Sequence, residues 1–112
     1  IQTVLELGCA SGDFLYHLPE NVQGTGIDIS DELIAEARKT RKRDNLEFHC
    51  QNVMDYNPKF KADLVVMTGF LCTFLDFKEI LTKAISLSNK YIFIKIKTEK
   101  IIIPPNKGVP LV

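Results

Sequence analysis

Glycines and carboxylates recur at intervals that suit the binding of a nucleoside-like ligand. The segment ELGCASG holds Gly8 and Gly12, and glycines let a chain turn sharply and let a ligand approach the backbone. Asp28 follows 20 positions after Gly8, and a carboxylate at about that distance accepts ribose hydroxyls in dinucleotide-binding folds. Asp55, in NVMDY, can accept a hydrogen bond from an exocyclic amine such as adenine N6. These signals together predict a nucleoside-binding site.

The same residues stand where predicted strands end. Short apolar runs of this kind are typical of buried parallel strands, and the last of them alternates in a way that suits a more exposed strand. The predicted strands cover residues 3–7, 24–29, 46–50, 62–68 and 90–97. Because the carboxyl ends of parallel strands meet at one edge of a sheet, where open α/β folds bind ligands, we expect the site at that edge.

Helical patterns separate these strands. The predicted helices cover about residues 12–18, a stretch after Ser30 that ends in KTRKR, and a stretch from Asp76 to about Leu87. Ser30 suits an N-cap, and Asp76 with Glu79 matches a capping box. The alternation predicts an α/β fold with a mainly parallel sheet of at least five strands and helices on both faces.

Three segments carry a family resemblance: VLELGCASGDFL, GTGIDIS and QNVMDY, followed more weakly by ADLVVMTGFLCTF. With them the chain resembles the class I S-adenosylmethionine-dependent methyltransferases over most of residues 3 to 97. The resemblance implies a Rossmann-like fold that binds S-adenosylmethionine and yields S-adenosylhomocysteine as the product. The family's sheet ends in an antiparallel hairpin, of which residues 101 to 112 could hold only a part. We therefore expect a partial domain that lacks the last strands.

The resemblance also assigns cofactor contacts. The glycine-loop motif would contact the methionine part, the carboxylate after the second strand would hold the ribose, and the residues after the third strand would contact the adenine. The end of the fourth strand would lie near the transferred methyl. The expected cofactor-binding residues are Glu6, Gly8, Ala10, Gly12, Asp28, Ile29, Met54, Asp55 and Thr68. No catalytic residue and no metal ligand is assigned.

The spacing of the loop argues against nicotinamide and flavin cofactors. Their binders usually show G-x-G-x-x-G, but here Ala10 and Asp13 stand at the second and third glycine positions. A pyrophosphate is anionic, whereas S-adenosylmethionine has no phosphate and tolerates Glu6 and Asp13 near the loop. A nucleotide-dependent oxidoreductase stays open as an alternative, as does a non-catalytic module that binds the cofactor or serves as a partner subunit.

Composition narrows the class. The 112 residues suit one domain, residues 1–112, and 46% hydrophobic with 25% charged residues is ordinary for a globular protein. Lysine plus arginine equals aspartate plus glutamate at 14 each, which gives no overall attraction to nucleic acid. No apolar run approaches the roughly 20 residues that a membrane-spanning helix needs. We expect a small-molecule acceptor, with protein and nucleic acid open, and a sheet edge beside the fifth strand that could pair with a second copy.

Several reactive residues have simpler explanations. Cys9, Cys50 and Cys72 are widely spaced and form no CxxC pair, which favours reduced thiols in a cytoplasmic protein. Cys9 near a helix N-terminus is either a nucleophile or, in the favoured interpretation, a small residue of the loop. The run Arg38 to Arg43 either touches RNA or, in the favoured interpretation, is a solvated helix end.

Overall fold

The computed structural model describes residues 1–68, 77–96 and 99–105. The regular elements follow the predicted alternation of strands and helices. In chain order they are β1 (Thr3–Leu7), α1 (Asp13–Tyr16), β2 (Gln23–Asp28), α2 (Asp31–Thr40), β3 (Leu46–Cys50), the 3₁₀ turn η1 (Val53–Asp55), β4 (Ala62–Thr68), α3 (Phe77–Leu87), β5 (Ser88–Ile96) and β6 (Glu99–Ile103).

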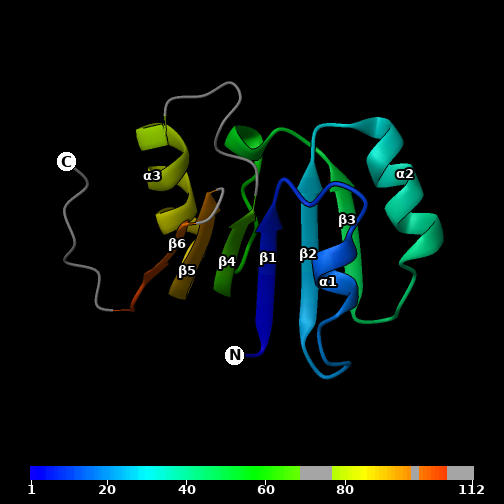
Figure 1. The fold of residues 1–112 in the computed structure, drawn as a ribbon, viewed down its shortest axis with the longest axis horizontal. Coiled ribbons are helices and arrows are strands. Elements are labelled where there is room, and N and C mark those ends of the chain that lie inside the picture. Colours follow the sequence, from blue (N-terminus) through cyan, green and yellow to red (C-terminus); the bar gives the residue numbers. More distant parts are fainter. Residues whose placement is uncertain (69–76, 97–98, 106–112) are drawn as a thin grey trace.

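The strands form one sheet in the order β3-β2-β1-β4-β5-β6 (Figure 1). Neighbouring strands from β3 to β5 are parallel, and β6 runs antiparallel to β5. The chain winds from β1 through β2 to β3 on one side and from β4 outward on the other. The strand order therefore reverses between β1 and β4, and such a reversal is where open α/β sheets bind ligands.

Helices cover both faces of the sheet, as the sequence predicted. On one face α1 and α2 bury an apolar cluster against β1 to β4, and on the other α3 packs against β1, β4 and β5. The first cluster contains Val4, Cys9, Leu15, Val22, Ile34, Ala37, Phe48 and Val66. The second includes Leu5, Leu7, Ile27, Val65, Met67, Ile80, Ala84 and Ile94. Strand alternation thus sends odd and even positions of β1 to opposite cores.

The outer edge of the sheet differs from the prediction. The register of β5 and β6 runs from Ile92 opposite Ile103 to Ile96 opposite Glu99, so β6 covers the side of β5 that was expected to be bare. The edge strand is β6. The sequence between the two strands, Lys97-Thr98, is not one of the glycine-containing pairs that mark tight hairpins, so no local signal predicted β6 as a separate strand.

Two other differences are local. Strand β5 begins at Ser88, directly after Leu87 ends α3, whereas the sequence predicted a strand from residue 90. The N-cap predicted at Asp76 lies outside the described residues, as does Cys72. No helix in the described ranges is long and apolar enough to cross a membrane, and no group of three or more metal-ligating side chains occurs in them.

Candidate functional site

The loop between β1 and α1 contains every residue with a positive φ in the described part of the chain. These are Gly8 at 76°, Ala10 at 50° and Gly12 at 85°. The amides of Gly8 and Cys9 both donate to the carbonyl of Ile27, at 2.8 and 3.0 Å. The loop therefore turns sharply at Gly8, as predicted, and is fixed to the carboxyl end of β2.

Close packing explains two of the glycines around this loop. A Cβ on Gly12 would lie 2.7 Å from the Phe48 ring, and one on Gly26 would lie 2.7 Å from Cys9 Sγ. The close approach predicted at Gly12 is thus made by a side chain of β3. Gly26 was missed by the sequence analysis, although its place in the GTGID strand, where a glycine has no side chain to pack, was the available signal.

Cys9 is buried against Gly26 and is a poor nucleophile. Burial raises the pKa of its thiol to about 12, and the charges of Glu6 and Asp28 add to the effect. Because the thiolate is the reactive form, this environment supports the interpretation of Cys9 as a packing residue of the loop.

Asp28 ends β2 and joins the loop to the start of α2. Its Oδ2 accepts from the amide of Ala10, and its Oδ1 accepts from the amide of Ser30, both at 2.9 Å. Ser30 in turn caps α2 by accepting from the amide of Leu33 at 3.2 Å, so the predicted cap is confirmed. Each carboxylate oxygen can accept more than one hydrogen bond, so Asp28 keeps capacity for ligand hydroxyls.

The segments after β2 and β3 present apolar surface next to Asp28. The backbone amide of Gln51 donates to the backbone carbonyl of Asp28 at 2.9 Å, which holds the segment after β3 beside the end of β2. Ile29 is 71% exposed and Met54 is 36% exposed. Asp55 is also exposed at the end of η1. Two exposed apolar side chains and an exposed carboxylate thus lie on the segments that follow the neighbouring strands β2 and β3.

Glu6 lies two residues before Gly8, and its carboxylate is only half satisfied. The residue is 2% exposed. Its Oε2 accepts from Thr68 Oγ1 at 3.1 Å, whereas Oε1 has no hydrogen-bond partner among the described residues. Burial raises the pKa of Glu6 to about 8; the Thr68 hydrogen bond lowers it, and the charges of Asp28 and Asp13 raise it.

All nine predicted cofactor-binding residues lie at one edge of the sheet. They follow or end β3, β2, β1 and β4, which are adjacent in that order, and Glu6 and Thr68 join the two strands at the reversal of strand order. The sequence analysis did not foresee the two backbone bonds to Asp28 or the unpaired oxygen of Glu6. Only packing between distant segments reveals them.

Three arginines of the basic run make structural contacts, while Arg38, Lys39 and Lys42 remain exposed at the end of α2. Arg38 donates twice to the carbonyl of Phe48, and Arg43 donates to the carbonyl of Tyr16 at 2.6 Å. Arg41 forms an ion pair with Asp13 at 2.5 Å. The Arg41 and Arg43 guanidinium groups also lie 5.0 and 5.4 Å from the centre of the Tyr16 ring. These contacts tie α1 to α2 and β3.

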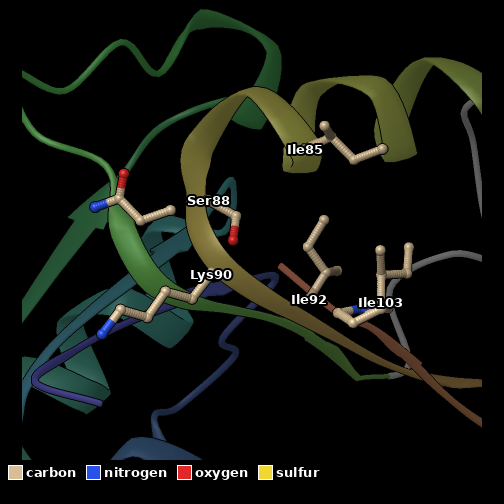
Figure 2. A pocket seen from close by; sticks show the side chains of 7 residues that line it. Ile85, Ser88, Lys90, Ile92 and Ile103 are labelled. Atoms are coloured by element: carbon tan, nitrogen blue, oxygen red, sulfur yellow. The ribbon is translucent and has the colours of Figure 1, made fainter. Parts of the chain in front are cut away.

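A separate hollow lies between α3 and the outer strands (Figure 2). Ile85, Ile92 and Ile103 form its apolar part, with Ser88 and Lys90 near the start of β5. Since β5 begins there, the hollow is at the opposite end of the sheet from the glycine loop. Its apolar lining suits packing and offers no acid–base pair.

Comparison with known proteins agrees with this geometry. A family model described as a methyltransferase domain matches residues 2–100. The malonyl-[acyl-carrier protein] O-methyltransferase of Bacillus cytotoxicus is 40% identical over 53 residues, which are 45% of this chain and 19% of that protein.

Solved structures share the fold. The plantazolicin methyltransferase BpumL, in complex with S-adenosylhomocysteine (SAH), has a TM-score of 0.75 and 24% identity, over 83% of this chain and 38% of that chain. The DhpI–SAH complex has a TM-score of 0.71 and 28% identity, over 83% of this chain and 48% of that one. PKMT2 from Rickettsia typhi has a TM-score of 0.75 and 26% identity, over 83% of this chain and 20% of that chain. The chain thus spans less than half the length of each.

Proposed function

Because the chain belongs to the methyltransferase domain family, we propose that it binds S-adenosylmethionine at the carboxyl edge of the sheet. In this proposal it is the cofactor-binding part of an S-adenosylmethionine-dependent methyltransferase. The similar structures solved with SAH support this choice of ligand.

The unpaired oxygen of Glu6 is the observation that carries the proposal. Buried polar atoms almost always have a hydrogen-bond partner, and leaving a buried carboxylate oxygen without one costs free energy. The methionine part of the cofactor has an ammonium group that can donate to this oxygen. Glu6 lies next to the loop where the reversal of strand order favours ligand binding, so a ligand there would relieve the deficit.

The charge of the site distinguishes this ligand from nucleotides. Glu6, Asp13 and Asp28 surround the loop, and Asp28 and Asp13 both act on Glu6 electrostatically. The nearby Arg41 is paired with Asp13. A pyrophosphate would meet carboxylates here, whereas a ligand with a sulfonium and an ammonium group would be attracted.

The remaining residues suit the adenosine. Asp28 has lone pairs free for ribose hydroxyls beyond its bonds to Ala10 and Ser30. Ile29 and Met54 offer exposed apolar surface to the adenine, and Asp55 offers an acceptor for its amine. Thr68, which ends β4, would lie near the methionine part.

The bound cofactor would supply a methyl group on a sulfonium, which is already a good leaving group. The work of this chain is then to fix the cofactor's orientation through the loop, Glu6 and Asp28 and to limit access of water. We assign no general base. For the acceptor we propose a small molecule; that the similar proteins are named for malonyl-[acyl-carrier protein] and plantazolicin supports an acceptor other than nucleic acid.

Calorimetric titration of SAH into the chain tests the proposal. We expect saturable binding that Asp28→Ala weakens by at least about tenfold, because a hydrogen bond to a charged group contributes about 1.5–3 kcal/mol. Asp44→Ala is the matched control, since Asp44 is an exposed carboxylate in the turn before β3, at the opposite end of the sheet. It should leave the affinity within about twofold.

Titration with NADH under the same conditions tests the oxidoreductase alternative. The proposal requires that NADH bind far more weakly than SAH. Tighter binding of NADH, or no binding of SAH by a chain that circular dichroism shows to be folded, would refute it.

A further inference from the structure

Glu6 is a buried acid, and none of the described residues forms an ion pair with it. It is 2% exposed, and in the described residues the ion pairs join Arg41 to Asp13 and Arg43 to Glu20, with none at Glu6. Among the described residues, the one hydrogen bond to its carboxylate comes from the neutral hydroxyl of Thr68. An ionised carboxylate in such a place costs several kcal/mol unless it is paired.

The titratable groups that face Glu6 are all acidic. Asp28 approaches from the end of β2 and Asp13 from the start of α1, and each raises the pKa of Glu6. The loop contributes the Cys9 thiol, whose own pKa is raised to about 12, so it stays neutral. From β4 the facing group is Thr68, which does not titrate. Nothing in these described surroundings compensates a negative charge on Glu6.

We infer that Glu6 carries a proton while the site is empty and gives that proton to solvent when a cationic group binds beside its free oxygen. The inference rests on the proposed function for the identity of the cation, the ammonium of the methionine part. The charges balance: a neutral acid and a cation become an ion pair and a released proton. No covalent bond other than the O–H bond of Glu6 breaks.

Because Glu6 must lose its proton when a cationic ligand binds, the ligand affinity should depend on pH. The pKa of Glu6 without ligand is about 8. Below that value binding must first remove the proton, so the affinity for a cationic ligand should fall by up to about tenfold per pH unit. A neutral analogue that leaves the proton on Glu6 should show no such dependence on pH.

Calorimetry in buffers of different ionisation enthalpy counts the released protons. With SAH at about pH 6 and 7 we expect close to one proton released per chain, and clearly less at about pH 8.5, where the ligand-free Glu6 is already partly ionised. Glu6→Gln should release none. Its affinity should be about tenfold weaker than that of the wild type at the higher pH, but equal or tighter at pH 6, because only the wild type loses affinity as Glu6 becomes protonated. Asp63→Asn, at the other end of the sheet, should behave as the wild type.

A second ligand tests the chemistry without any variant. 5′-Methylthioadenosine keeps the adenosine but lacks the amino acid part, so it should bind with little proton release and little dependence on pH below about pH 8. Saturable SAH binding without proton release at pH 6, or the same release from Glu6→Gln or with 5′-methylthioadenosine, would overturn the inference and leave the proposed function standing. Absence of SAH binding at every pH would instead refute the proposed function, and this inference with it.

Discussion

Two carboxylates at opposite ends of the β1–β4 strand pair differ in how fully they are hydrogen-bonded. At the amino end, Asp63 accepts from the backbone amides of Gln2 and Thr3 through Oδ2, at 2.8 and 3.3 Å. At the carboxyl end, Glu6 has one hydroxyl donor and one unpaired oxygen. The hydrogen bond from Gln2 holds the pKa of Asp63 below its usual range, whereas burial raises that of Glu6 to about 8.

The contrast separates a structural carboxylate from one suited to binding. Asp63 is stabilised as an anion by the chain itself, so the fold gains from its charge and no ligand is needed. Glu6 is destabilised as an anion by the same strands. Perturbed acids of this kind gather at functional sites, which favours a ligand-binding role for Glu6 over a purely structural one.

The largest predicted effect is on stability as a function of pH. The folded pKa of Glu6, about 8, lies above the ordinary value of 4.5, so the folded chain holds an extra proton between these values. The stability from this proton is fully present below about pH 4.5 and is lost as the pH rises through 8. The free energy of unfolding of the ligand-free chain should therefore fall by roughly 3–5 kcal/mol over this range.

Urea unfolding followed by circular dichroism at several pH values measures this change. Glu6→Gln should remove the decline, since glutamine does not titrate. Asp63→Asn should affect only the acid limb, because a lowered pKa gives stability that is present above about pH 4 and lost as the pH falls. If the free energy of unfolding changed with pH in the same way for the wild type and Glu6→Gln, Glu6 would not be destabilised as an anion, and the contrast with Asp63 would be wrong.

Local patterns in the sequence predicted much of this arrangement. The alternation of strands and helices predicted a mainly parallel sheet with helices on both faces and placed Asp28 and Asp55 at its carboxyl edge, and the family resemblance added Thr68. The strand β6 was missed as a separate element because the Lys97-Thr98 connection carries no turn signal.

Features set by contacts between distant segments could not be predicted. The sequence indicated Glu6 as a motif residue, but its missing partner depends on which side chains of β2, β4 and α1 surround it. The role of Gly26 depends on Cys9 packing across from another element. The contacts of Arg38 and Arg43 were not predicted because the carbonyls of Phe48 and Tyr16 that accept from them are remote in sequence.

The second effect concerns two glycines of β2 on the same face. A Cβ on Gly26 would lie 2.8 Å from Cys9 Cβ, close to the loop backbone, whereas one on Gly24 would meet the flexible end of Leu46 at 2.8 Å. Gly26→Ala should destabilise the chain by about 2–3 kcal/mol and Gly24→Ala by about 1–2 kcal/mol. Only Gly26→Ala should also weaken SAH binding in calorimetry, since it displaces the loop; equal binding by both variants would contradict this.

A third test compares the threonine hydroxyls that bond to the two acidic residues, Thr68 to the carboxylate of Glu6 and Thr3 to the backbone amide of Asp63. Thr68→Val removes the only hydrogen bond to the carboxylate of Glu6 in the described residues and should raise its pKa further, weakening SAH binding at pH 7 by about fivefold. Thr3→Val removes the hydroxyl that accepts from the amide of Asp63 at 2.9 Å. It should cost about 1 kcal/mol of stability and leave calorimetric binding unchanged. A loss of binding in both variants would point to a general loss of structure.

The smallest effect concerns Ala10, which has a φ of 50°. A left-handed conformation costs an L-residue about 1–2 kcal/mol, and the extra freedom of glycine in the unfolded chain costs about 0.5–1 kcal/mol. Ala10→Gly should therefore stabilise the chain by about 0.5 kcal/mol, which corresponds to a rise in Tm of roughly 2–4 °C. The hydrogen bond from the backbone amide of residue 10 to the Asp28 carboxylate should be kept. Ala62→Gly in β4, at the amino end of the strand pair, should lower Tm. Opposite signs would show that backbone strain is concentrated beside Glu6, and a lower Tm for both would place no strain in the loop.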